Sequence, residues 1–313
     1  MTDRFANASF PDLVDPSDAR PLPSAFGTAR ADVLAAAADL LAISDAGLVK
    51  PWDWIGGSEE EVRYGAYRAA EALEQAEIEA RSLVTVGEAT ERRAALIVGP
   101  ATAARWDLHG LLVPLDDALL DADPGGGEWS IRQTLGHTIN SQRGYGWGSA
   151  YWLGQTYDVA DPALPKGAPE SYWDGFPDEE TTEAEGDLAT LRARLDAILD
   201  LCGERFGGLA DERLELGSRW SGFAVTVGFR LGRWSSHFRE HAIQIEKTFA
   251  FLGHVPSEQA RLIHNLLAAY GRAEAVVFGR AGAGVDAAAD RIARAAAEAR
   301  EATSSARAAA EAT

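Results

Sequence analysis

The chain has 313 residues, and 46% of them are hydrophobic, which is enough to fill the core of one large domain or two small ones. Its 48 acidic residues outnumber its 29 basic residues and give a formal net charge of −19, which repels a polyphosphate over most of the surface. The composition therefore excludes wholesale disorder and argues against nucleic acid as a ligand.

The cysteine content and the hydropathy of the chain indicate in which cellular compartment the protein is expected. The single cysteine, Cys202, cannot form a disulfide within the chain, which is typical of a reducing environment. No segment approaches the roughly 20 apolar residues that a membrane helix needs, and the first residues lack the layout of a secretory signal. We therefore expect a cytoplasmic protein that does not associate with a membrane.

The N-terminal quarter is expected to be partly irregular and partly helical. Residues 1–27 contain four prolines and no sustained period, which indicates an irregular arm. An alanine- and leucine-rich helix is expected over 29–43. The next helix is predicted to begin with a capping box at Ser58 and Glu61 and to reach about Val84.

Two further helices are predicted around a glycine-rich break. One helix is expected over 91–120, with a kink at Pro114 because proline removes a backbone hydrogen bond. The segment 123–127, Asp-Pro-Gly-Gly-Gly, ends it. A second capping box at 130–133 predicts that a helix starts at Ser130 and reaches at least Gly144.

The C-terminal half begins with a long loop and continues as helices. Residues 157–181 are rich in proline, glycine and aspartate, with Tyr172, Trp173 and Phe176 embedded among them, as is typical of a loop that borders a site. No two-residue alternation typical of strands appears in the sequence, so the predicted class is all-α with a helix bundle as core. Helices are expected over 182–206, 225–252 and 257–278. The alanine-rich segment 285–312 is expected to be either a helix lying on the body or a frayed helix, because it has little large apolar surface to bury.

The histidines indicate metal chemistry. His237 and His241 are four residues apart in the predicted helix 225–252, so both imidazoles project from one side and can reach one cation. His137 is the best candidate for a third ligand. Polar residues on its face leave room for a ligand: Thr134, Ser141 and Tyr145. Spacing alone does not decide between a metal site and a packed pair of histidines.

An alternative interpretation uses the five-residue segment from His237 to His241. The segment 237–241 matches H-x-x-E-H, the inverted zinc-protease signature, in which Glu240 would be the general base and a distant glutamate the third ligand. That interpretation leaves His137 without a role. Glu240 is more simply an outer hydrogen-bond acceptor or a solvated residue, although it is the only acid close in sequence to the predicted ligands.

Three segments together resemble the DinB superfamily. They are Glu128-Trp129-Ser130-Ile131-Arg132-Gln133-Thr134-Leu135-Gly136-His137, then His237-Phe238-Arg239-Glu240-His241, then Phe251-Leu252-Gly253. The resemblance covers roughly residues 88–253. It implies a four-helix bundle that binds a divalent transition metal, commonly zinc or nickel, through three histidines, which map to His137, His237 and His241.

The resemblance also implies a range of functions. Characterised members include mycothiol-dependent maleylpyruvate isomerase and bacillithiol S-transferases, in which the metal is thought to activate the cofactor thiol, whereas many members have no known activity. We therefore expect a metal-dependent S-transferase or isomerase that acts on a small molecule with a low-molecular-weight thiol such as mycothiol. A hydrolase with Glu240 as base and a non-catalytic metal-binding or helical interaction protein stay open, as does a homodimer.

The domain organisation follows from these boundaries. An irregular arm and helical extension is expected over 1–87, the DinB-like bundle over 88–255 and a C-terminal helical extension over 256–313. Gln244, one turn after His241, is placed to orient that ligand. Four other residues are expected to serve packing or the surface: His109, His254, His264 and Cys202.

Overall fold

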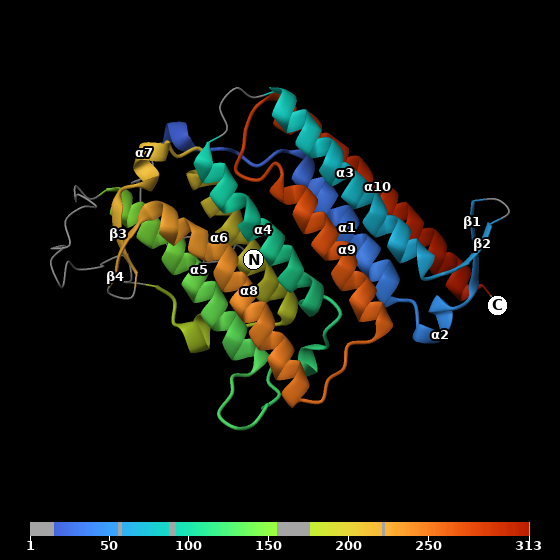
Figure 1. The fold of residues 1–313 in the computed structure, drawn as a ribbon. Coiled ribbons are helices and arrows are strands. Elements are labelled where there is room, and N and C mark those ends of the chain that lie inside the picture. Colours follow the sequence, from blue (N-terminus) through green and yellow to red (C-terminus); the bar gives the residue numbers. More distant parts are fainter. Residues whose placement is uncertain (1–15, 56–57, 88–91, 155–175, 221–222, 313) are drawn as a thin grey trace.

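The computed structural model describes residues 16–55, 58–87, 92–154, 176–220 and 223–312. Within these ranges the protein is mostly helical, as the composition and periodicity predict, and its long helices form two four-helix bundles that lie side by side (Figure 1). None of the helices in these ranges is long and apolar enough to cross a membrane.

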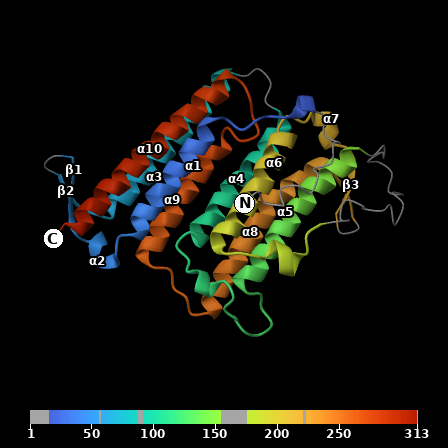
Figure 2. The same ribbon diagram turned by 180° about the vertical axis from the view of Figure 1, so that it is seen from behind.

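The first bundle holds the predicted DinB-like helices. α4 packs against α6 and α8, and α5 packs against the same two helices. Each helix thus contacts two neighbours, and the four enclose one core (Figure 2). The bundle consists of α4 (Arg93–Leu112), α5 (Ile131–Leu153), α6 (Leu188–Phe206) and α8 (Val227–Phe251).

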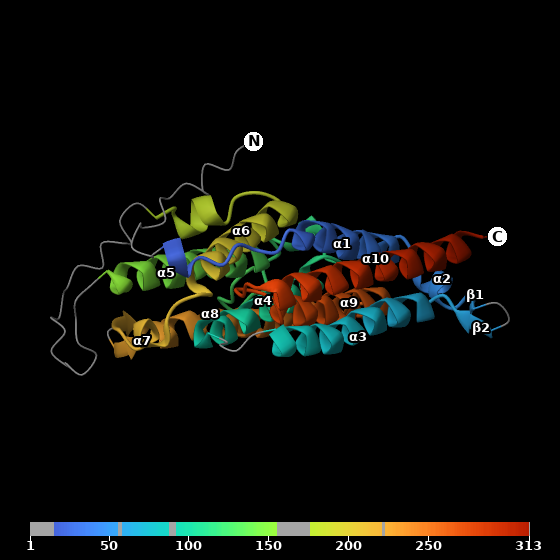
Figure 3. The same cartoon turned by 90° about the horizontal axis from the view of Figure 1, so that it is seen from above.

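The second bundle combines the two ends of the chain. α10 packs against α3 and α1, and both of these helices also contact α9. The predicted N-terminal and C-terminal extensions therefore each supply two helices to one unit, and Figure 3 shows this unit beside the first bundle. Its helices are α1 (Ala25–Leu41), α3 (Tyr64–Gly87), α9 (Glu258–Ala275) and α10 (Ala283–Glu311).

Short elements connect the long helices. Two antiparallel hairpins occur in the described residues, β1 with β2 and β3 with β4. The strands are β1 (Pro51–Ile55), β2 (Ser58–Glu61), β3 (Gly217–Trp220) and β4 (Phe223–Thr226). The short helical elements are η1 (Pro16–Asp18), α2 (Asp45–Leu48), η2 (Asp117–Leu119), the π-helical turn η4 (Glu179–Glu183) and α7 (Asp211–Leu214).

A buried ionic network joins the two bundles where α4 packs along α9. Glu274 of α9 is completely buried and accepts hydrogen bonds from Arg30 of α1 at 2.8 and 2.9 Å and from Arg105 of α4 at 2.7 Å. Both arginines also reach Asp200 of α6. Burial alone would raise the pKa of Glu274, but the charges of Arg30 and Arg105 and their hydrogen bonds override it and lower the pKa to about 2.

Three sequence predictions about helix ends are wrong. Ser58 does not cap a helix, because residues 58–61 form β2 and α3 begins at Tyr64. α4 is not kinked at Pro114, because it already ends at Leu112. The helix expected over 182–206 begins only at Leu188, because residues 179–183 form η4 and α6 is capped by Asp187, whose side chain accepts from the amide of Thr190. A capping pattern is four residues long and does not reveal which neighbouring strand or turn competes for them.

Other predicted ends are confirmed. Ser130 and Gln133 form the reciprocal capping box of α5, Gly253 ends α8 with a φ of 66°, and Ser257 caps α9. The alanine-rich C-terminal segment is one continuous helix. Residues 1–15 of the predicted arm and most of the predicted loop 157–181, including Tyr172 and Trp173, lie outside the described residues.

Candidate metal centre

The three histidines predicted as ligands lie together between α5 and α8. His137 projects from the second turn of α5, and His237 and His241 project from adjacent turns of α8. One ring nitrogen of each histidine lies within 4.8 Å of those of the other two. The Nε2 atoms of His237 and His241 are 3.0 Å apart. The structure thus brings together residues that are separated by about a hundred positions in the chain.

Local sequence explains why α8 presents two imidazoles to α5. Thr226 caps the helix by accepting from the amide of Phe229, which fixes where α8 begins. Apolar residues at three- and four-residue steps then bury one face of α8 against the bundle, and the two histidines belong to that buried face. The buried apolar side chains of this face are Val227, Leu231, Trp234, Phe238, Ala242, Ile245 and Phe249.

Burial keeps two of the rings neutral. Loss of solvent lowers the pKa of His237 to about 2, and the nearby rings of His241 and His137 add to this effect. Burial also lowers the pKa of His241, although the hydrogen bond to Gln244 opposes the shift. Neutral imidazole is the form that binds a metal ion, so these two side chains are already in the binding state near neutral pH.

Two of the three rings are oriented by partners on their outer nitrogen. Nδ1 of His137 lies 2.9 Å from Oε1 of Glu179, and Nδ1 of His241 lies 2.9 Å from Oε1 of Gln244. Each of these contacts leaves Nε2 directed toward the cluster. Nδ1 of His237 is buried and has no hydrogen-bond partner among the described residues.

The donor set fits a transition metal. Zn–N bonds of 2.0–2.1 Å place the nitrogens of a tetrahedral site about 3.3–3.4 Å apart. The separations in the cluster, 3.0 Å for one pair and no more than 4.8 Å for any pair, bracket that value. Without an ion, the Nε2 atoms of His237 and His241 can share a hydrogen bond in which one neutral ring donates to the other. A bound cation would replace that hydrogen bond with two metal–nitrogen bonds. These three imidazoles are therefore suited to hold one divalent ion.

Glu240 lies at the rim of the cluster and is engaged elsewhere. Its side chain is 52% exposed, and both carboxylate oxygens accept from Arg233 at 2.9 Å. Arg233 also donates to Ser236 and lies 4.9 Å from the ring centroid of Trp220. Arg233 and Glu240 thus form a salt bridge on the exposed side of α8.

One aromatic residue marks the access side of the cluster. Trp129 is 39% exposed, and its ring centroid lies 5.0 Å from that of His137. The His137 side chain itself is 29% exposed. The cluster therefore opens toward solvent at His137, while His237 and His241 form its buried side.

The remaining histidines and the cysteine take the structural roles expected of them. His109 is buried and hydrogen-bonds to Asp196 at 2.8 Å. His264 pairs with Asp107 at 2.8 Å, and His254 packs its ring against Phe249. Cys202 is completely buried, and burial raises the pKa of its thiol, so it is not a nucleophile at neutral pH.

Sequence reasoning missed Glu179 and Asn140. Glu179 belongs to η4, 42 residues after His137, and its second oxygen accepts from Nδ2 of Asn140 at 2.8 Å. Gln244, by contrast, is one turn from its histidine and was predictable from helical spacing. The chain offers no local signal for Glu179, because its position depends on how η4 folds back onto α5.

Comparison with known proteins agrees with the geometry. Residues 101–245 match the model of the DinB superfamily. The chain carries a DinB superfamily domain. The matched range includes α5, η4, α6 and most of α4 and α8, and therefore contains all three histidines as well as Glu179 and Gln244. No curated protein and no solved structure gives a significant match.

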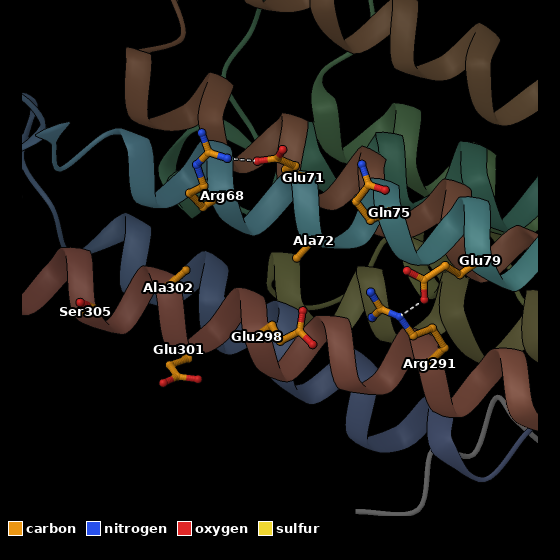
Figure 4. A pocket seen from close by; sticks show the side chains of 10 residues that line it. All are labelled: Arg68, Glu71, Ala72, Gln75, Glu79, Arg291, Glu298, Glu301, Ala302 and Ser305. Carbon is orange, nitrogen blue, oxygen red and sulfur yellow. Dashed lines mark hydrogen bonds and ion pairs between the residues drawn. The ribbon is translucent and has the colours of Figure 1, made fainter. Parts of the chain in front are cut away.

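A groove on the second bundle is distinct from this DinB site. It lies between α3 and α10 and has a volume of about 740 Å³. Its two arginines already pair with glutamates, Arg68 with Glu71 and Arg291 with Glu79 (Figure 4). The groove is a solvated, charged face of the second bundle, and it brings no imidazole or thiol together.

Proposed function

We propose that the protein is a metal-dependent enzyme of the DinB type that uses a low-molecular-weight thiol in an S-transfer or isomerisation. The observation that carries this proposal is the convergence of His137, His237 and His241. Two of their outer nitrogens are hydrogen-bonded, and the two imidazoles on α8 are kept neutral by burial. Imidazole ligands are compatible with zinc and nickel, which makes these the metals to test first.

The charge of the site supports thiol chemistry. Three neutral ligands leave the charge of a divalent ion uncompensated, and when bound the ion favours the thiolate form of a cofactor thiol near neutral pH. His137 is the ligand on the solvent side, so a small molecule would approach past it and the indole of Trp129. In a transfer the sulfur forms a bond to an electrophilic carbon, the leaving group departs with its electron pair, and the thiol proton passes to solvent.

The carboxylates around the cluster favour a thiol over water as nucleophile. Hydrolysis needs a general base within hydrogen-bond reach of the attacking water. Glu240 is bound by Arg233, and Glu179 is bound by His137 and Asn140. Within the described residues, both acids nearest the histidines are therefore engaged, which supports S-transfer and isomerisation and makes hydrolysis the second candidate.

A turnover assay tests the proposal. Purified protein loaded with zinc or nickel would be incubated with mycothiol and a panel of small electrophiles. Loss of free thiol together with product mass would report transfer, and a change in the proton NMR spectrum of the substrate at constant mass would report isomerisation. We expect turnover by the natural chain and none by His237→Ala. His254→Ala provides the matched control, because this histidine lies near the end of α8 and outside the cluster. Metal-dependent stabilisation without turnover of thiols, esters or amides would support the non-catalytic alternative instead.

A further inference from the structure

The turn η4 is built onto α5 directly beside the histidine cluster. A Cβ atom at Gly136 would lie 2.8 Å from the carbonyl oxygen of Glu179 and 2.8 Å from the Cβ of Ala184, which is closer than real contacts permit. Glycine at position 136 therefore allows the backbone of η4 to lie against α5 one residue before His137. This close approach brings the side chain of Glu179 to the outer edge of the His137 ring.

Buried and partly buried arginines hold the C-terminal end of η4 in place. Arg143 of α5 donates to Oε1 of Glu183 at 2.7 Å, and both side chains are almost completely buried. Arg194 of α6 donates to the carbonyl oxygen of Glu183 at 2.8 Å, and Arg132 donates to that of Ala184 at 2.8 Å. Three charge-assisted contacts thus fix the turn on the first bundle.

Both oxygens of Glu179 are used. Oε1 lies 2.9 Å from Nδ1 of His137, and Oε2 accepts from Nδ2 of Asn140 at 2.8 Å. Because a carboxylate accepts hydrogen bonds and does not donate them, the proton of a neutral His137 must be on Nδ1. Nε2 then carries the lone pair and is available to a metal ion, with the Ser141 hydroxyl 3.4 Å away.

We propose that Glu179 is the positioning residue of the metal centre, and that it selects the tautomer and the ring orientation in which His137 binds the ion. The proposal rests on the proposed function only in assuming that the three histidines hold a metal. Glu179 acts through His137 and is not itself a ligand.

The three histidines differ in the hydrogen bonds that hold their rings, so the effect of removing one partner can be compared with the effect of removing another. His137 is held by a charged group that a second side chain orients, whereas His241 is held by the neutral amide of Gln244 and His237 by no partner among the described residues. A charge-assisted hydrogen bond is roughly twice as strong as a neutral one. Loss of Glu179 should therefore weaken metal binding more than loss of Gln244.

The test compares Glu179→Gln with Glu180→Gln, which removes the same charge from the exposed neighbouring residue of η4. The amide at position 179 keeps the size of the side chain but removes its charge, so it can keep the contact with His137 only as a weaker neutral hydrogen bond, with the amide of Asn140 turned over to accept from the new NH2 group. Zinc affinity is measured by competition with a chelator at fixed pH, and circular dichroism checks that each variant is folded. We expect zinc affinity to fall about 10–100-fold in Glu179→Gln, less in Gln244→Ala, and not at all in Glu180→Gln.

A second measurement needs no metal. Nitrogen-15 NMR of the apo protein reports which ring nitrogen of His137 carries the proton, and we expect Nδ1–H in the natural chain and in Glu180→Gln but a mixture of tautomers in Glu179→Gln. Unchanged zinc affinity in Glu179→Gln, or an unchanged tautomer of His137, would overturn the proposal. If the natural chain binds no zinc or nickel, the proposed function fails, whereas the tautomer measurement still decides whether Glu179 positions His137.

Discussion

The two bundles differ in the side chains that fill the interfaces between their helices. In the second bundle α10 contributes alanines to the buried interface, and its backbone approaches α3 so closely that a Cβ at Gly65 would lie 2.4 Å from the Cβ of Ala306. In the first bundle the α5–α8 interface holds imidazoles, an indole and a phenol instead. Small side chains bring helices together, whereas large polar ones separate them and leave nitrogen atoms that can face an ion.

This difference indicates a division of labour. The second bundle contributes helix packing and the buried Glu274 of the ionic network, and the first bundle contributes the histidine cluster. The two meet along α4 and α9, so a change in one bundle can be measured against an unchanged property of the other.

The largest expected effect comes from removing the carboxylate at the junction. Glu274→Ala leaves the guanidinium groups of Arg30 and Arg105 without their buried partner, and breaking a buried ion pair in this way costs about 3–5 kcal/mol. Chemical denaturation should show that loss in the free energy of unfolding. Glu71→Ala, which removes an exposed partner of Arg68, should cost less than about 1 kcal/mol. Equal losses in the two variants would contradict the conclusion that the buried ion pairs of Glu274 stabilise the contact between the two bundles.

The titration of Glu274 should make the stability of the protein sensitive to acid. Its pKa is about 2 in the folded protein and near its ordinary value of 4.5 in the unfolded chain, so its contribution to stability is complete above pH 4.5 and is lost as the pH falls toward 2. Unfolding free energies measured between pH 5 and 2 should therefore fall more steeply for the natural chain than for Glu274→Gln. Parallel curves for the two proteins would show that Glu274 does not titrate as described.

A smaller effect is expected where the helices of the second bundle approach most closely. Alanine usually stabilises a helix relative to glycine, but in Gly65→Ala the added methyl group meets Ala306, and such overpacking costs about 1–3 kcal/mol. Gly27→Ala in α1 is the matched control, because a Cβ there meets no atom within 4 Å. Thermal unfolding should separate the two variants while their zinc affinities stay equal; a stabilising Gly65→Ala would argue against close α3–α10 packing.

The smallest expected effect is at the rim of the first bundle. Glu240→Gln should change thiol turnover by no more than a few-fold, because Glu240 is bound by Arg233 and has no assigned role in S-transfer. Loss of a general base would instead cost on the order of 10²-fold or more. A loss of that size with unchanged metal content would favour water as the nucleophile.

The sequence predicted those parts of the site that depend on local periodicity. The four-residue spacing of His237 and His241, the capping box that starts α5 and the turn from His241 to Gln244 are all properties of single helices. The position of Glu179 and the packing of α10 depend on contacts between segments that are distant in the sequence. The strand β2 was not predicted because its residues Ser58 and Glu61 also match a helix-capping pattern. The histidines of the candidate metal centre could therefore be predicted from helical spacing, whereas Glu179, the residue hydrogen-bonded to His137, could not.

The central claim is that His137, His237 and His241 form one metal site. Elemental analysis of protein purified without an affinity tag tests it most directly, using the natural chain, the three single alanine variants of these histidines and His254→Ala. We predict about one transition-metal ion per chain in the natural protein and in His254→Ala, and strong depletion in each of the other three. Metal that stays substoichiometric after reconstitution, or that persists when all three histidines are replaced together, would contradict the account.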